Sequence, residues 1–85
     1  MKTITLNDGT VVNGNILDNG DGIKIFVYLF GMSLMEGYQL FSNTENVSRI
    51  VANEYDNETV YEGYTEIMAI NTEFGNCNLV MRQPV

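Results

Sequence analysis

Carboxylates are the only side chains in this sequence that are numerous enough to suggest acid–base chemistry. Glu62 and Glu66 are of the residue type that glycoside hydrolases use as a catalytic pair. Such a pair works in a cleft, and a chain of 85 residues has too thin a core to build one easily. With no histidine and one cysteine, Cys77, the chain lacks the usual base for a nucleophile and the ligands of a zinc site. We therefore expect no enzyme, no metal and no cofactor.

The acidic residues are concentrated in one segment. Six of them lie between positions 54 and 73, where there is no Lys or Arg, and the net charge of the chain is −7. In a continuous strand, residues at even positions share one face and lie about 6.7 Å apart. A two-residue turn at Asp56-Asn57 would instead move Glu58 and Glu62 off the face of Glu54, whereas a longer loop would keep them together. Five acids occupy these even positions: Glu54, Asp56, Glu58, Glu62 and Glu66.

Three tyrosines are interleaved with these acids, and this composition is common at protein-binding surfaces. A row of carboxylates offers hydrogen-bond acceptors to Lys and Arg and accelerates association with a basic partner. The alternative is that the acids are a solvated edge that prevents strand-to-strand aggregation, while the tyrosines pack on the sheet. The predicted partner-binding residues are Glu54, Tyr55, Asp56, Glu58, Tyr61, Glu62, Tyr64 and Glu66.

Charge and hydropathy limit the partners and the location. An isoelectric point near 4.1 argues against direct binding to nucleic acid or to an anionic membrane. The longest apolar stretch, residues 25–30, is far too short to span a bilayer, and no signal peptide is recognisable. The single cysteine indicates a reducing compartment, so we expect a cytoplasmic protein.

Turn signals divide the chain into short strands. Asn7-Asp8-Gly9-Thr10 and Asp18-Asn19-Gly20-Asp21-Gly22 are typical of tight hairpin turns. Ser33 and Glu36 match a capping box at the start of a helix over residues 34–41. We predict a single α+β domain, residues 1–85, with one short capped helix and a small antiparallel β-sheet of five to seven short strands in hairpins. The expected strands are 2–6, 11–17, 23–30, 47–54, 59–64, a continuation or sixth strand over 65–72, and 77–82.

Strand 23–30 is apolar on both faces after Lys24, which predicts a central strand. Either both of its faces are covered, or one face is covered and the other is used as an interface. The helix, with an apolar stripe of Leu34, Tyr38 and Phe41, should cover the face that the first two strands leave open. Gly14 suggests a bulge or a weak edge in its strand. These patterns raise the possibility of a homo-oligomer formed through strand 23–30 and helix 34–41.

Three stretches, residues 40–50, 61–67 and 75–81, resemble small acidic proteins of phages and prophages of Gram-positive bacteria. The similarity covers most of the chain. It implies a viral protein in a phage context, either a virion or tail-region accessory or a small early protein that blocks a host defence system. It brings no functional residues with it.

Together these observations favour a non-enzymatic protein-binding module of phage type, acting in the bacterial cytoplasm. In the leading hypothesis it is an acidic anti-defence inhibitor that occupies a basic, nucleic-acid-binding surface of a bacterial defence protein. The first alternative is a virion or tail-region structural or assembly protein that self-associates. The second alternative is a sponge for a small nucleotide, for which Lys24, Arg49 and Arg82 are the available cations.

Overall fold

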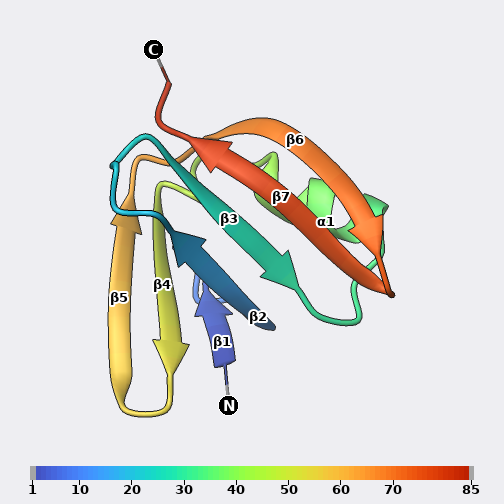
Figure 1. The fold of residues 1–85 in the computed structure, drawn as a ribbon, viewed down its shortest axis with the longest axis horizontal. Coiled ribbons are helices and arrows are strands. Elements are labelled where there is room, and N and C mark those ends of the chain that lie inside the picture. The colour runs from blue at the N-terminus through green and yellow to red at the C-terminus, as the bar shows by residue number, and fades with distance from the viewer. Residues whose placement is uncertain (1, 85) are drawn as a thin grey trace.

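The computed structural model describes residues 2–84 and confirms an α+β fold with one antiparallel sheet and one short helix (Figure 1). The seven strands lie in the order β5-β4-β1-β2-β3-β7-β6. In chain order the elements are β1 (Lys2–Thr5), β2 (Val11–Asp18), β3 (Lys24–Leu29), α1 (Leu34–Phe41), β4 (Arg49–Glu54), β5 (Asn57–Glu62), β6 (Glu66–Glu73) and β7 (Asn76–Arg82).

The two edges of the sheet are consecutive in sequence. Only residues 63–65 link β5 to β6, so the chain spans at most about 14 Å between the end of one strand and the start of the other. From that end the two strands diverge, with the β4–β5 hairpin on one side and the β6–β7 pair on the other (Figure 1). The sheet is therefore strongly curved, and its concave face encloses the core.

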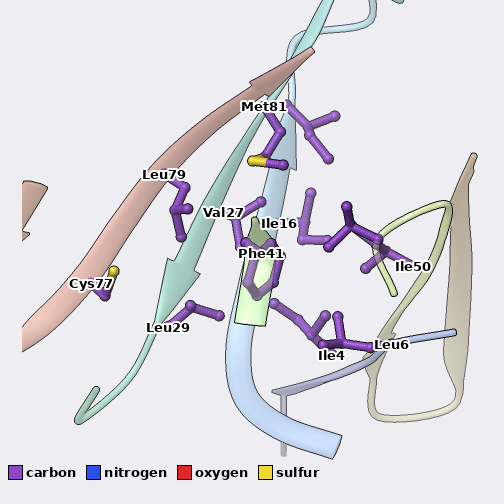
Figure 2. Close-up of a cluster of buried hydrophobic side chains, with 12 residues drawn as sticks. Ile4, Leu6, Ile16, Val27, Leu29, Phe41, Ile50, Cys77, Leu79 and Met81 are labelled. Atoms are coloured by element: carbon purple, nitrogen blue, oxygen red, sulfur yellow. The ribbon is translucent and has the colours of Figure 1, made fainter. Parts of the chain in front are cut away.

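The core is a single cluster on one face of the sheet, with Phe41 of α1 inserted among the strand side chains (Figure 2). Burying a residue such as Phe41 stabilises the fold by about 1.5–3 kcal/mol. Cys77 is a free, buried cysteine within this cluster. The buried residues of this cluster are Ile4, Leu6, Ile16, Ile25, Val27, Leu29, Phe41, Val47, Ile50, Cys77, Leu79 and Met81.

Helix α1 has the predicted bounds. The Ser33 hydroxyl oxygen accepts the Glu36 amide at 3.2 Å and donates to the Glu36 carboxylate at 3.0 Å. The predicted apolar stripe is wrong for two of its three members, because Leu34 and Tyr38 are exposed and only Phe41 is buried. The helix instead approaches the sheet through Gly37, which has no side chain to hold it away.

Gly14 lies where β2 changes its pairing partner, because residues 11–13 pair with β1 and residues 14–18 pair with β3. Neither register shows a bulge, so the predicted bulge is wrong. A Cβ at this position would overlap the carbonyl oxygen of Tyr28 and the Cδ1 of Ile4. Because Gly14 has no side chain, the Ile4 side chain and the backbone of β3 at Tyr28 can both lie close to it.

Two further expectations about the sheet need correction. The first two strands belong to the same sheet as β3, with β2 directly beside it, so neither covers a face of β3. The β4–β5 turn is Tyr55-Asp56, one residue earlier than predicted, and Glu54 pairs with Asn57 across it. The segment 65–72 resolves into the separate strand β6.

Candidate protein-binding site

The predicted acidic segment forms a hairpin whose last strand is an edge of the sheet. We call residues 54–62 the acidic hairpin. Five of the six residues of β5 are exposed. Tyr55 and Asp56 form the tip, where the Tyr55 side chain is 81% exposed and its backbone has a φ of 55°. Figure 1 shows this hairpin standing apart from α1 and the β6–β7 pair.

The two-residue turn divides the acids between the two faces of the hairpin. Tyr61 lies opposite the buried Ile50 and therefore on the core side of β5, so Glu58 and Glu62 project from the other side. Glu54 shares the face of Asn57 and forms an ion pair with Lys2, with 3.4 Å between Oε1 and Nζ. The structure thus follows the alternative in which Glu58 and Glu62 leave the face of Glu54.

Glu66 lies on β6, at the opposite edge of the sheet from Glu58 and Glu62. Its two carboxylate oxygens accept hydrogen bonds from Nε and Nη2 of Arg82 at 3.0 and 2.9 Å. These bonds lower the pKa of Glu66 and raise the pKa of Arg82. A partner that used Glu66 would have to compete with this bidentate pair.

Tyr61 and Tyr64 have structural contacts within the fold. Their rings meet edge to face with centroids 6.2 Å apart, and Tyr61 packs against the core. Burial raises the pKa of the Tyr61 hydroxyl, with a further contribution from the nearby Asp18 charge. The Tyr64 hydroxyl donates to the carbonyl oxygen of Gly22 at 3.3 Å. These two rings hold the short β5–β6 connection against the sheet.

Three carboxylates of the acidic hairpin have no cationic partner. Among residues 2–84, ion pairs within 4 Å join only Lys2 to Glu54 and Arg82 to Glu66. Arg49 is opposite Glu62 in the β4–β5 register but makes no such pair. Glu58 and Glu62 are four residues apart on one strand, about 13 Å, so solvent screens most of their repulsion. The unpaired set is Asp56 at the tip beside Tyr55, Glu58 near the tip, and Glu62 at the opposite end of β5.

Other kinds of site find little support in the described part of the chain. No group of three or more Cys, Asp or Glu side chains in residues 2–84 is arranged to hold a metal ion. Over the same residues, α1 is the only helix, and it is too short to cross a bilayer. Of the three cations named for a nucleotide site, Lys24 and Arg82 are direct neighbours across β3 and β7. Arg49 lies on β4, so the three do not form one group on adjacent strands.

Comparisons with known proteins leave the site to be interpreted from its geometry. No family model, curated protein or solved structure matches this chain.

Strand 23–30 has one covered face and one open face, which is the second of the two arrangements that its apolar pattern predicted. Phe26, Tyr28 and Phe30 alternate with the buried residues of β3 and therefore point away from the core. No helix or strand of residues 2–84 packs over them, because α1 lies on the core side of the sheet. The two apolar faces of strand 23–30 were the available signal, and the structure shows that one is covered and the other is open.

Proposed function

We propose that this chain is a non-enzymatic protein-binding module, an inhibitor whose acidic hairpin occupies a basic, nucleic-acid-binding surface of a bacterial defence protein. The supporting observation is the tip residue Tyr55, which is 81% exposed, has a positive φ, is next to Asp56 and belongs to the same hairpin as the unpaired Glu58 and Glu62. The phage context remains an implication of the sequence resemblance.

The backbone of Tyr55 argues for a role outside the fold. A non-glycine residue in the left-handed region costs about 1–2 kcal/mol, whereas Gly or Asn adopts it readily. Tyr55 gains little packing in return, since 81% of its surface is exposed. Strained residues retained in this way concentrate at binding sites, and tyrosine is a frequent anchor in protein interfaces. We therefore place Tyr55 at the centre of the interface.

The neighbouring charges define the partner. Asp56, Glu58 and Glu62 offer acceptors to Lys and Arg, and their field would accelerate encounter with a basic surface. Duplex DNA carries one charge per about 1.7 Å of its axis, far denser than the single row of Glu58 and Glu62. The hairpin therefore does not imitate a duplex. It supplies one aromatic anchor and a few carboxylates that block the groove.

Two variants with equal net charge test this proposal. D56N/E58Q/E62Q neutralises the acidic hairpin, and E36Q/E45Q/E73Q makes the same charge change at exposed sites elsewhere. Each chain is immobilised and exposed to an extract of a Gram-positive host. We expect the wild-type chain and the second variant to capture the same nucleic-acid-binding protein, and the first variant to fail to capture it. Retention by all three, or by none, would refute the proposal. Retention should also weaken as salt rises, because exposed charges are screened.

A specific observation favours self-association as the second candidate function, that of a virion or tail-region assembly protein. The outer side of α1 exposes Leu34, Met35 and Tyr38, with Met35 69% and Tyr38 52% accessible. This side and the open face of β3 lie on opposite sides of the sheet, so a two-fold symmetric interface would use one of them, whereas a head-to-tail contact would join one to the other. Light scattering at increasing concentration should show oligomers that M35K/Y38K abolishes; a monomer at all concentrations would exclude this candidate.

A further inference from the structure

The open face of the sheet carries an ordered arrangement of aromatic and amide side chains. We call it the outer face, formed by the side chains of β2, β3, β7 and β6 that point away from the core. The strand register places its residues in cross-strand rows. One row is apolar and consists of Leu17, Phe26, Val80 and Ala69. The next is Asn15, Tyr28, Asn78 and Asn71.

The aromatic pair Phe26 and Tyr28 separates two hollows on this face. One has a volume of about 220 Å³ and includes Asn71, Asn78 and Val80 in its lining. The other has a volume of about 420 Å³ and is lined by Leu17, Asp18 and Asn19 on its far side. Both are lined by the same two aromatic rings. The pair therefore forms a ridge with a shallow site on each side.

One polar atom in the first hollow lacks a partner. The Oδ1 of Asn78 is buried and accepts no hydrogen bond from residues 2–84. Such an atom destabilises the folded state, and an apolar side chain of similar shape would remove the penalty. Asn71, the residue opposite Asn78 on β6, makes no side-chain hydrogen bond to it. The lining of the first hollow thus contains one acceptor without a partner among residues 2–84.

From this arrangement we infer that the outer face binds a neutral, polyhydroxylated chain, that is, a glycan. The C–H side of a sugar ring packs against an aromatic face, which carries partial negative charge. Each sugar hydroxyl is both donor and acceptor, and each Asn side chain offers both functions in return. A hydroxyl can donate to Asn78 Oδ1 while the ring rests on Tyr28. The Phe26–Tyr28 ridge lies between two sugar-sized hollows.

The charges around the outer face argue for a neutral ligand. The two central rows contain no ionisable group other than the Tyr28 hydroxyl. The cations at one end are already engaged, because Arg82 binds Glu66 and the Lys24 ammonium lies 5.7 Å from the Phe26 ring centroid. Among residues 2–84 of this face, a nucleotide phosphate would therefore find Lys24 as the one cation without a carboxylate partner, and that cation lies at one end of the face. A basic peptide would find its nearest carboxylates only at the rim, at Glu73 and Asp18.

The inference is tested by titrating the ¹⁵N-labelled chain with three tetrasaccharides, of β-1,4-glucose, α-1,4-glucose and β-1,4-N-acetylglucosamine. We expect at least one to give saturable amide shifts that map to β3, β7 and β6. ATP and tetralysine serve as competing ligand classes. If none of the three sugars causes amide shifts at concentrations up to about 20 mM, the inference is wrong. Stronger binding of ATP or tetralysine at the same residues would also overturn it.

Two substitutions separate ligand binding from folding. Asn78→Val removes the unpartnered acceptor, so we expect a melting temperature higher by roughly 4 °C or more together with loss of sugar binding. Tyr28→Ala should weaken sugar binding about tenfold or more, because it removes both the stacking of the sugar on the ring and the contact area of the ring. Tyr38→Ala on the opposite side of the sheet is the matched control. Unchanged sugar affinity in both N78V and Y28A would refute the site.

A second copy of the chain is the other occupant that the experiment can reveal. Amide shifts on the outer face that grow with protein concentration alone, and that Tyr28→Ala removes, would show a homodimer there and overturn the glycan inference. Because these residues lie outside the acidic hairpin, loss of sugar binding leaves capture of a host protein unaffected. The two proposals therefore fail independently.

Discussion

Gly37 of α1 lies so close to Cys77 of β7 that a Cβ at position 37 would overlap the Cys77 Sγ. Both residues are buried, and Leu29 completes the contact. Glycine inside a helix costs about 1 kcal/mol relative to alanine. At this position it stabilises the fold instead, because its missing side chain lets the helix reach the sheet.

Gly37→Ala should therefore destabilise the protein despite the higher helix propensity of alanine. We expect the free energy of unfolding in urea to fall by about 1–3 kcal/mol, the usual range for overpacking a core. In the double variant G37A/C77A the loss should be smaller than the sum of the two single losses, because the overlapping sulfur is gone. A stabilised G37A variant would show that the helix packs elsewhere.

The Cys77 thiol should react only when the protein opens. Its burial raises its pKa, so little reactive thiolate forms near neutral pH. We predict that a thiol reagent labels the native protein at least a hundredfold more slowly than the urea-unfolded chain, with G37A giving a faster native rate. Labelling can be followed by mass spectrometry. Equal rates in the native and unfolded states would contradict the buried position.

The local elements were predictable because short-range chemistry specifies them. The Ser33–Glu36 cap defined the start of α1, and the Asp-Gly turns defined the first hairpins. The strand order was not predictable, because pairs such as β1 with β4 join residues about fifty positions apart. The helix face was misassigned because a glycine contact carries no hydrophobic signal.

The candidate site was predictable in composition but not in geometry. Whether the acids share a face depends on a single turn, and Tyr55-Asp56 is not a favoured turn sequence. Nothing in the local pattern revealed that Glu66 binds Arg82, or that Tyr64 reaches the Gly22 carbonyl. The first contact depends on the register of β6 with β7, and the second on the curvature that brings the β5–β6 connection to the turn between β2 and β3.

The two hairpin tips with exposed aromatic residues should be stabilised by asparagine. Phe74 has a φ of 53°, is 94% exposed and precedes Gly75, which also has a positive φ. Two positive φ values favour Asn-Gly in a two-residue turn. We expect Phe74→Asn and Tyr55→Asn each to raise the free energy of unfolding by about 0.5–1.5 kcal/mol.

Only the second of these substitutions should affect the proposed partner. If Tyr55 is the anchor, Tyr55→Asn stabilises the fold but weakens binding to the host protein, while Phe74→Asn leaves that binding intact. Thermal unfolding and a binding assay on the same preparations provide the comparison. Full binding by the Tyr55→Asn variant would remove Tyr55 from the interface.

Stability should fall in acid partly through the Glu66–Arg82 pair. The hydrogen bonds from Arg82 lower the pKa of Glu66 in the folded state. Its contribution is therefore present above the pKa of an unfolded glutamate, about 4.3, and is lost as the pH falls through the lower folded value. Asp8 and Asp21 act in the same direction, because backbone amides in their turns lower their pKa values.

Glu66→Gln isolates the contribution of this pair. We expect the variant to lose less stability than the wild type between pH 5 and pH 2.5 in urea titrations, while Glu45→Gln, at an exposed site, follows the wild-type curve. An identical pH dependence for wild type and E66Q would show that the ion pair contributes nothing to acid unfolding.

An acidic hairpin that occupies a nucleic-acid-binding surface must compete with nucleic acid for the host protein. The host protein retained by the wild-type chain is purified, loaded with fluorescent nucleic acid and titrated with each variant. We expect displacement of the nucleic acid by the wild type and by E36Q/E45Q/E73Q, with displacement by D56N/E58Q/E62Q about tenfold weaker or more. Equal displacement by all three chains, or binding without displacement, would contradict it.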